Sequence, residues 1–466
     1  MEINKVIDGN YCIGCGACGL GRATVEPLIS MNALGFYEAR LDEEVDTRVD
    51  HVCPFTNTGP DESEIAKSLL EDRYQSHHEY IGSYISLYAG HASTGGFRER
   101  GSSGGITTWL LAKLLNKGKV DAIVHVRASE KPGLLYEYGV SSDLDTLYSG
   151  AKSHYYPVEM SGVLRHIHEK QGRYAVVGVP CFIKALRRLM LVEPVFSERI
   201  VYCGGLFCGH LKGKGFAEML ATQCEVGPTE LFSFDFRTKL SGRSSSDYGV
   251  TATGVLNGEK FKKISPVSQL VGTDWGMGFF KYKACDYCDD ISAETADFSV
   301  GDAWLPKYKN DHRGTNILIV RNEDVQSIVD EGIISGDLTL EIISADEVIE
   351  SQRANVRHRR EDLPYRLRIA DEAGLWRPKK RQCAGRSISK KRQLIQDCRI
   401  SFQEQIPALW NNALVQGNPK SFFNAIQPLI KRYKKIYTPF FLIRLHRRIK
   451  RMSYTCLKNI VKCLFG

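Results

Sequence analysis

The amino-acid sequence predicts an α/β protein, α+β over the whole chain, and three observations support this. From about Tyr84 onward, apolar segments with the composition of buried strands alternate with helical segments. This pattern is typical of a largely parallel central sheet covered by helices. Residues 230–275 break the alternation with strand-like segments that turn at Asn257-Gly258, which predicts an antiparallel insertion. The first 60 residues carry closely spaced cysteines and glycines and are too short to fold without a bound group.

The elements expected in the α/β part follow one another along the chain. Core strands are expected at residues 84–92, 120–128, 173–179, 199–209, 297–304 and 315–322. Helices are expected at residues 104–118, at 182–190 and from 213 onward, and the insertion is expected to hold strands at 232–239 and 248–264. A polar connecting helix is expected at residues 61–80, and the chain becomes rich in Arg and Lys after about residue 351.

The net charge of +8 is concentrated in the last part of the chain. Residues 431–466 hold eleven Lys or Arg and no Asp or Glu, so +8 less 11 leaves −3 for residues 1–430. A near-neutral body does not favour nucleic-acid binding. Two interpretations of the tail stay open. It is either a basic amphipathic segment on an anionic membrane surface, or a helical extension that packs on the body, on another subunit or on a second copy of the chain. Pro439 argues against one uninterrupted helix.

The cysteine content indicates both location and chemistry. No stretch reaches the roughly 18 apolar residues of a membrane span, and the start MEINKVIDGNYC lacks the apolar region of a signal peptide. We therefore expect a cytoplasmic protein, held at the inner face of the membrane if the tail binds lipid. Fourteen cysteines in a reducing compartment indicate metal or redox chemistry. Six have no ligand spacing and are expected to be buried or free thiols: Cys203, Cys224, Cys383, Cys398, Cys456 and Cys463.

The first cysteine group is a C-x2-C-x2-C pattern formed by Cys12, Cys15 and Cys18. The glycines between them let the backbone turn closely and direct amide N–H groups at the sulfurs. A two-cluster ferredoxin would have its next cysteine at Arg22, so no second cluster is expected in this segment. Cys53, followed by a proline, supplies a fourth thiolate. The set favours a [4Fe-4S] cluster, and a zinc site, which four thiolates can also form, stays the alternative.

The second cysteine group combines distant parts of the chain. Cys285 and Cys288 form a C-x2-C pair that needs further ligands. Cys181 and Cys208 each follow a predicted strand, and sites in open α/β sheets form outside the carboxyl ends of the strands. On its own, Cys181 could equally be a core thiol or a redox-active cysteine, and Cys203 stays an alternative to Cys208.

These motifs together resemble a known family. GSSGG (101–105), GVPC (178–181), the cysteine of GLFCGH (205–210) and CDYCDD…ADFSVGDAW (285–304) are similar, in order and spacing, to the beta subunit of coenzyme F-420 hydrogenase and dehydrogenase. The resemblance covers roughly residues 5–345. The family includes 7-hydroxymethyl chlorophyll a reductase and many bacterial proteins of polysaccharide gene clusters.

The resemblance implies a domain organisation and a set of cofactors. Residues 1–60 would form a 4Fe-4S ferredoxin-type domain, and residues 61–350, with parts 84–160 and 165–345, a domain that binds FAD and a further [4Fe-4S] cluster. Residues 351–466 would be a basic, mostly helical extension. By position, the resemblance implies that the ligands of the further cluster are Cys181, Cys208, Cys285 and Cys288.

The flavin site is also implied by the resemblance. The GSSGG loop opens a predicted helix, whose N-terminus suits a phosphate, although without the family context a plain loop would be the better interpretation. The implied contacts are Gly101, Ser102, Ser103, Gly104 and Gly105, with Lys152 of GAKSHYYP. Asp302, Thr315 and Asn316 are weaker candidates, and Asp297 and Asp302 could equally be turn residues.

The resulting hypothesis is an iron–sulfur flavoprotein oxidoreductase. A ferredoxin-like carrier would exchange single electrons with the two clusters, and FAD would reduce or oxidise a small organic substrate. The basic extension favours the polysaccharide-biosynthesis branch, with a sugar or lipid-linked acceptor. Two other classes stay open: a non-catalytic electron-transfer subunit of a larger hydrogenase or dehydrogenase complex, and a zinc-stabilised interaction protein. Catalytic residues are unassigned, and the histidines, which lack metal-binding spacing, are expected to be surface or packing residues.

Overall fold

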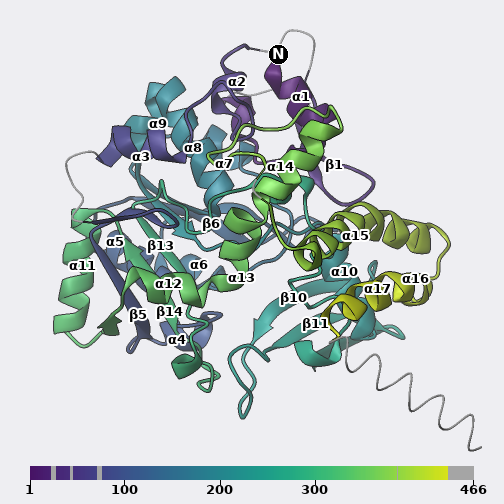
Figure 1. The fold of residues 1–466 in the computed structure, drawn as a ribbon. Helices are drawn as coiled ribbons and strands as arrows, with labels where there is room; N and C mark the ends of the chain where they lie inside the picture. The colour runs from purple at the N-terminus through teal and green to yellow at the C-terminus, as the bar shows by residue number, and fades with distance from the viewer. Residues whose placement is uncertain (22–27, 42–45, 71–75, 386, 439–466) are drawn as a thin grey trace, which may run out of the picture.

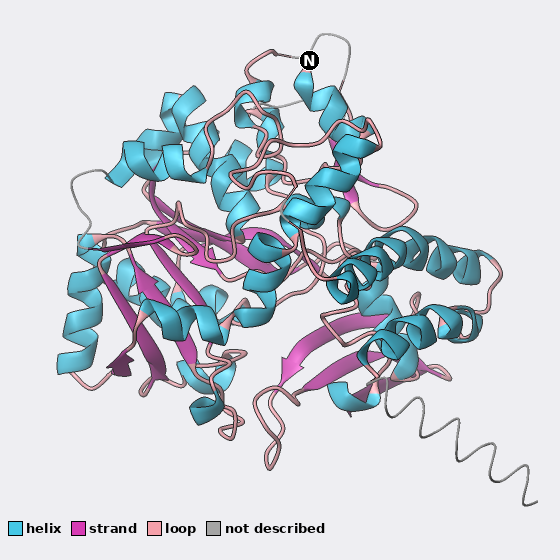
Figure 2. Ribbon diagram, viewed as in Figure 1, coloured by secondary structure: helices cyan, strands magenta, loops and turns pink. Residues whose placement is uncertain are grey.

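The computed structural model describes residues 1–21, 28–41, 46–70, 76–385 and 387–438. Its largest element is an eight-stranded sheet in the order β15-β5-β14-β13-β9-β8-β6-β7 (Figures 1 and 2). The strands are β5 Ser86–Ala92, β6 Ala122–Ala128, β7 Tyr136–Ser141, β8 Tyr174–Gly178, β9 Ile200–Leu206, β13 Phe298–Asp302, β14 Asn316–Val320 and β15 Leu338–Ile342. Helices lie on both faces of the sheet, so the predicted α/β class is confirmed.

The sheet is mixed, and the expectation of a largely parallel sheet is wrong at both of its edges. The four neighbouring strands β13, β9, β8 and β6 run parallel. On one side β14, β5 and β15 pair antiparallel, and on the other side β7 does so. The antiparallel β14 is buried throughout, as the parallel β8 is. A strand buried on both faces is apolar whichever way it runs, so composition could not reveal its direction.

Helices cover the two faces of the sheet. α7 Ser161–Glu169 and α8 Pro180–Val192 pack on one face, and α5 Ile106–Asn116 and α11 Glu323–Ile334 pack on the other. Successive side chains of β8 alternate between these cores: Val176 packs with α7 and α8, and Val177 packs with α5 and α11. The shorter helices and 3-10 turns are α4 Phe97–Arg100, α6 Leu144–Ser149, α9 Pro194–Arg199, Val267–Gln269, Lys283–Tyr287 and Pro306–Tyr308.

The N-terminal segment packs on the sheet through α8. It consists of α1 Glu2–Asp8, a 3-10 turn at Ala17–Gly19, the hairpin β1 Ile29–Met31 with β2 Tyr37–Ala39, and α2 Val49–Val52. Ile3 of α1, Val52 of α2 and Leu186 of α8 belong to one buried core. The connecting helix expected at 61–80 is shorter than predicted: α3 spans Glu62–Leu70, and a hairpin of β3 Ser76–His78 and β4 Gly82–Tyr84 follows.

The predicted antiparallel insertion is confirmed. β10 Leu231–Thr238, β11 Gly249–Leu256 and β12 Glu259–Pro266 form a separate three-stranded antiparallel sheet. Its tight turn has positive φ at both Asn257 (54°) and Gly258 (84°), as a two-residue hairpin of this hand requires. The insertion packs against α10 Gly215–Gln223, α15 Lys390–Val415 and α17 Gln427–Tyr437, at the lower right of Figure 1.

The C-terminal extension returns over the body before it reaches the insertion. It contains α12 Ala345–Ser351, α13 Arg353–Val356, a π-helical turn at Arg357–Glu361, α14 Leu363–Glu372, α15, α16 Ser421–Ala425 and α17. α14 shares the buried core of α1 and α8. Within the described residues no helix is both long and apolar enough to cross a membrane. The basic tail from residue 439 onward lies outside the described residues.

Candidate functional site

The first cysteine group gathers around one small cavity under α1. Cys12, Cys15 and Cys18 lie on the loop that joins α1 to the 3-10 turn, and Cys53 follows the last residue of α2. All four line the cavity. The structure therefore brings together the four cysteines that the sequence pattern grouped.

Two glycines shape this loop. Gly14 (φ 62°) and Gly16 (φ 85°) both have left-handed backbone conformations. A Cβ on Gly14 would lie 2.3 Å from the Cβ of Tyr37, and a Cβ on Gly16 would lie 2.6 Å from the backbone nitrogen of Ser161. Any larger side chain would therefore displace the loop, because real Cβ atoms do not approach other atoms so closely.

The environment of these thiols opposes their ionisation. Burial raises the pKa of all four, and ionised neighbours in the group raise those of Cys15, Cys18 and Cys53 further. The pKa of Cys53 reaches about 12. The backbone N–H of Gly14 donates to Cys12 Sγ at 3.4 Å and lowers the pKa of that thiol. Four buried thiols with converging N–H donors suit a compact cationic group, because its positive charge would stabilise the thiolates.

The second cysteine group lies where two parallel strands end. Cys181 is in the first turn of α8, directly after β8, and Cys208 comes two residues after β9. Because β8 and β9 are parallel neighbours, their carboxyl ends meet at one edge. Cys285 lies in the 3-10 turn Lys283–Tyr287, and Cys288 follows it.

Electrostatic contacts show that these four side chains lie together. Burial raises the pKa of Cys181 well above its usual value, and Cys288, Cys208 and Cys285 raise it further, in that order. Cys203 lies apart from them: burial raises its pKa to about 12, and its charged neighbours are Arg187 and Asp297. The structure thus places Cys208, not Cys203, with the other three.

The two cysteine groups are neighbours. Cys15 of the first group contributes to the raised pKa of Cys181 in the second. The buried Tyr138 lies beside both, because Cys181 and Cys15 each add to the effect of burial in raising the pKa of its phenol. Its hydroxyl donates to the carbonyl of Val177 at 3.0 Å, and its ring stacks on Phe182 with centroids 6.0 Å apart.

Neither cysteine group has the compactness of a single-ion site. Across the described residues, no three Cys, His, Asp or Glu side chains are close enough together to hold one metal ion. Zinc lies about 2 Å from each of its ligands, whereas an iron–sulfur cube is larger and its thiolates stand farther apart. In the described part of the chain, the zinc alternative therefore has no ligand group to support it.

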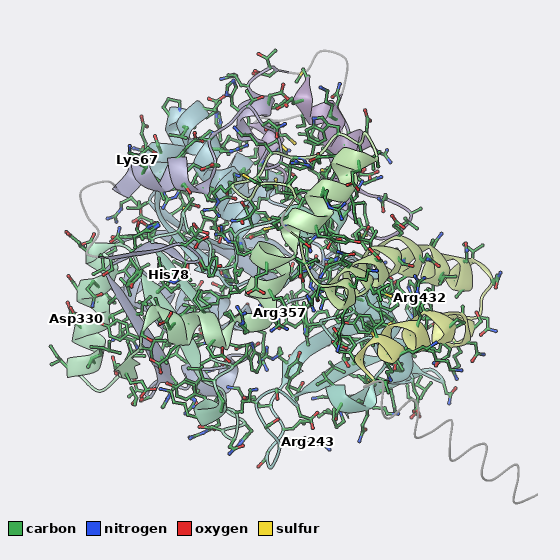
Figure 3. The ribbon with its side chains drawn as sticks, in the orientation of Figure 1. Lys67, His78, Arg243, Asp330, Arg357 and Arg432 are labelled. Atoms are coloured by element: carbon green, nitrogen blue, oxygen red, sulfur yellow. The ribbon has the colours of Figure 1, made fainter. Side chains whose placement is uncertain are left out.

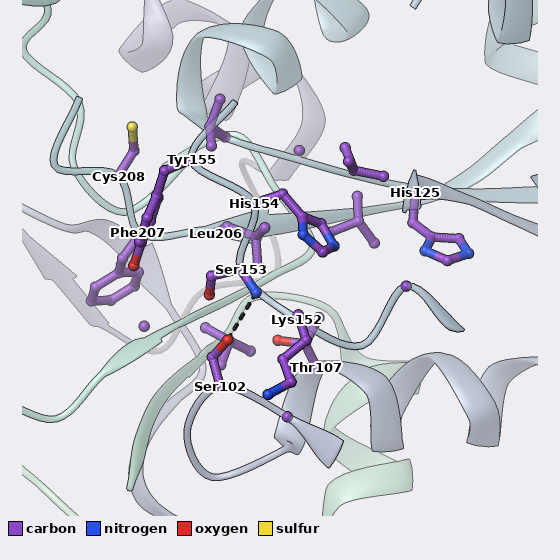
Figure 4. A pocket seen from close by; sticks show the side chains of 18 of the residues that line it. Ser102, Thr107, His125, Lys152, Ser153, His154, Tyr155, Leu206, Phe207 and Cys208 are labelled. Carbon is purple, nitrogen blue, oxygen red and sulfur yellow. Dashed lines mark hydrogen bonds between the residues drawn. The ribbon is translucent and has the colours of Figure 1, made fainter. Parts of the chain in front are cut away.

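A cavity of about 270 Å³ opens beside the second cysteine group. It extends from the N-terminus of α5 to Cys208, which is one of its lining residues (Figure 4). The implied flavin contacts Ser102, Ser103, Gly105 and Lys152 line it, as do Asp302 and Asn316. Gly104 and Thr315 do not.

The loop at the start of α5 is held by its own hydrogen bonds. Ser153 N–H donates to Ser102 Oγ at 2.8 Å (Figure 4), and Ser103 Oγ donates to the carbonyl of Thr315 at 3.0 Å. A Cβ on Gly104 would lie 2.7 Å from the carbonyl oxygen of Gly90, so this glycine permits a close approach to β5 instead of facing the cavity. Gly105 caps the N-terminus of α5 with φ 79°.

The phosphate-sized end of the cavity has charged residues near it. Lys152 pairs with Asp235 at 3.0 Å and donates to the carbonyl of Arg237 at 3.3 Å. Lys239 donates to the carbonyls of Arg98 and Ser103, and burial lowers its pKa to about 8. Positive charge and the N-terminus of α5 thus lie at one end of the cavity, where an anion would be favoured.

The other end of the cavity holds residues that sequence reasoning missed. The ammonium of the buried Lys212 lies 4.1 Å from the ring centroid of Phe216 and 4.8 Å from that of Trp275. Burial, and next the charge of Lys281, lowers the pKa of Lys212 well below its usual value. The ring of Tyr155 packs edge-on against Trp275 with centroids 4.8 Å apart.

Two histidines expected to be surface or packing residues line this cavity. His154 stacks on Tyr136 with centroids 4.0 Å apart, and burial lowers its pKa to about 4. Neither of its ring nitrogens, nor Nε2 of His210, has a hydrogen-bond partner among the described residues. Both follow motifs already singled out, GAKS and GLFC, and that adjacency was the available signal.

Comparison with known proteins agrees with these motifs. Two family models match, and both describe the beta subunit of coenzyme F420 hydrogenase/dehydrogenase: its N-terminal part matches residues 87–165, and its C terminus matches residues 171–346. The coenzyme F420-dependent sulfite reductase of Methanocaldococcus jannaschii is 26% identical over 395 residues, which cover 78% of this chain and 53% of that protein. The chain thus spans about half the length of that relative.

Two further comparisons come from Methanosarcina. The F-type subunit of the F(420)H(2) dehydrogenase of Methanosarcina mazei is 24% identical over 336 residues, covering 69% of this chain and 82% of that protein. A chain of the F420-reducing [NiFe] hydrogenase complex from Methanosarcina barkeri has 14% identity and a TM-score of 0.47, covering 63% of this chain and 96% of that chain. On the two family matches, this chain belongs to the family of coenzyme F420 hydrogenase/dehydrogenase beta subunits.

Proposed function

We propose that this chain is an iron–sulfur flavoprotein oxidoreductase that exchanges electrons with a ferredoxin-like carrier and reduces or oxidises a small organic substrate. The observation that carries the proposal is the contiguity of three features. The first cysteine group adjoins the second through Cys15 and Cys181. The second group adjoins the cavity through Cys208.

The residues fit the groups that the proposal requires. One [4Fe-4S] cluster would be held by Cys12, Cys15, Cys18 and Cys53, and another by Cys181, Cys208, Cys285 and Cys288. FAD would place a phosphate near Ser102, Ser103 and Lys152, where the N-terminus of α5 and a positive charge lie. When bound, the clusters supply one-electron transfer and the flavin supplies exchange between one- and two-electron steps.

The side chains of the protein would control the surroundings of this chemistry. Tyr138 fills the space between both cysteine groups and the cavity with an aromatic side chain that is 8% exposed. Lys212 holds an ammonium at the aromatic end of the cavity without a carboxylate partner in the described part of the chain. A buried cation there favours negative charge on whatever occupies the cavity.

A second candidate function is a non-catalytic electron-transfer subunit of a larger complex. It is favoured by the relative from the F(420)H(2) dehydrogenase, which is named as a subunit and of which this chain covers 82%. The sugar or lipid-linked acceptor of polysaccharide biosynthesis stays a prediction from the sequence.

Anaerobic purification of the full chain tests the proposal. We expect about eight irons and one flavin per chain, as two cubic clusters and FAD require, with two distinct cluster signals in electron paramagnetic resonance (EPR) spectra. Four irons, or protein that contains zinc but no flavin, would contradict it. Turnover by the chain alone with reduced ferredoxin or viologen separates the enzyme from the electron-transfer subunit.

A further inference from the structure

The π-helical turn Arg357–Glu361 lies beyond residue 346, where the family matches end. Three consecutive residues in it, His358, Arg359 and Arg360, are buried, with 9%, 1% and 3% exposure. In a regular α-helix, successive side chains point about 100° apart, so three in a row do not share one face. The turn is therefore enclosed by protein on several sides. Arg357, which begins the turn, is labelled in Figure 3.

Each of the three buried side chains reaches a different segment of the second cysteine group. His358 Nε2 lies 3.4 Å from the carboxylate of Asp286, which stands between Cys285 and Cys288. Arg359 Nη2 donates to the carbonyls of Cys208 at 2.9 Å and Gly209 at 2.8 Å.

The third contact completes the enclosure on the far side of the cysteine pair. Arg360 Nη2 donates to Glu294 Oε1 at 2.7 Å, six residues after Cys288. Arg366 of α14 adds a bond from Nε to the carbonyl of Asp286 at 2.7 Å. The extension thus closes over the loops that carry Cys208, Cys285 and Cys288.

Charge compensation distinguishes Arg359 from its neighbours. Arg360 has a carboxylate partner in Glu294. In the part of the chain that the structure describes, Arg359 has none, and its Nε and Nη1 atoms have no hydrogen-bond partner. A guanidinium buried to this degree costs several kcal/mol unless an anion or a set of acceptors stands beside it.

The anionic groups nearest to Arg359 are the four cysteines. Burial lowers the pKa of this guanidinium, but ionised Cys288, Cys208, Cys285 and Cys181 more than offset that and raise it. The effect is mutual: burial raises the pKa of Cys208 to about 11, and the charge of Arg359 acts against it. The unpartnered guanidinium therefore faces the place where thiolate charge would gather.

We propose that Arg359 is the fixed counter-charge of the second cluster and sets its reduction potential. The inference rests on the proposed function, because it requires a cluster on Cys181, Cys208, Cys285 and Cys288. Adding one electron to a group held by four thiolates increases its negative charge, and a nearby fixed positive charge stabilises the reduced state more than the oxidised one. Arg359 would thereby raise the potential of this cluster relative to the first, and ease electron entry.

Two variants of the full chain test the proposal by redox titration followed by EPR. Arg359→Gln removes the charge, and Arg359→Lys keeps it. For Arg359→Gln we expect the one-electron equilibrium constant of the second cluster to fall at least tenfold, which is a shift of about 59 mV to lower potential. For Arg359→Lys we expect a smaller change. The first cluster should keep its wild-type potential in both variants and serves as the internal control.

Every outcome decides the question. An unchanged second-cluster potential in Arg359→Gln, with both signals intact, would overturn the proposal. Loss of the second signal in Arg359→Gln but not in Arg359→Lys would support it, since the charge would then be needed to hold the cluster. Loss in both variants would assign Arg359 a merely structural role and overturn it. A wild-type protein with four irons and no second signal would overturn the cluster assignment itself, and this is distinguishable because it appears before any variant is made.

Discussion

Substituting alanine for Gly16 should remove the first cluster while the second one persists. Gly16 has φ 85°, where an L-residue costs about 1–2 kcal/mol. Its new Cβ would lie 2.6 Å from Ser161 N and 3.0 Å from Glu159 Oε2. The first of these atoms is backbone and cannot rotate away, and overpacking of this kind costs about 1–3 kcal/mol. Together the two effects predict a loss of about 2–5 kcal/mol in the stability of the cysteine loop.

A neighbouring glycine provides a matched control. Gly162 is next to Ser161 in α7, and a Cβ there would meet nothing within 4 Å. Gly162→Ala should therefore stabilise the helix by up to about 1 kcal/mol. Iron content, EPR and guanidinium unfolding of both anaerobically purified variants provide the measurement. Gly16→Ala should bind about half the wild-type iron and keep the second signal. If it unfolds at the wild-type denaturant concentration with both signals present, the close approach to Ser161 does not hold the loop.

The remaining predictions concern the second cysteine group, the flavin and pH. Cys285→Ser should abolish the second EPR signal and halve the iron while Cys203→Ser leaves both unchanged, because Cys203 lies apart from the group; two intact signals in Cys285→Ser would refute the ligand assignment. Ser102→Ala should raise the flavin Kd about fivefold, as expected for loss of a hydrogen bond worth about 1 kcal/mol, here the one from Ser153 N–H that orders the loop; equilibrium dialysis measures it, and an unchanged Kd would exclude this loop from the flavin site. Burial lowers the pKa of His125 from 6.5 to about 4, so the unfolded chain binds a proton more readily than the folded one between these values, and about 3 kcal/mol of stability present above pH 6.5 should be lost as the pH falls to 4. Denaturant unfolding at pH 7 and pH 5 should show a smaller loss for His125→Gln than for the wild type, and equal losses would contradict the assignment.

Local patterns in the sequence carried the cysteine groups and the insertion. The spacing of Cys12, Cys15 and Cys18 is set by one loop, and the Asn257-Gly258 turn needs only its own two backbone conformations. Strand direction was not accessible in this way, because β14 and β8 have the same buried apolar composition although they pair in opposite senses.

Residues that act at long range were also missed. Lys212, Trp275 and Arg359 meet the cavity or the cysteines from segments far apart in the chain, and none carries a local pattern. After residue 351 the apolar periodicity of the sequence is weak, because charged side chains such as Arg359 and Arg366 take buried positions that a binary pattern assigns to apolar ones. Gly104 shows the converse: its loop was identified, but this residue faces β5 and not the cavity.

The late position of the π-helical turn in the chain has a consequence for biosynthesis. All eight cysteines of the two groups precede residue 289, whereas the side chains that close over Cys208 and Cys285 begin at residue 358. During synthesis, the second cysteine group is therefore complete before the turn that encloses it leaves the ribosome. Iron and sulfide can be delivered to an open site in that interval, and the arriving extension then seals it. A chain that ends at residue 350 should assemble the same cluster but lose it readily to chelators and oxygen.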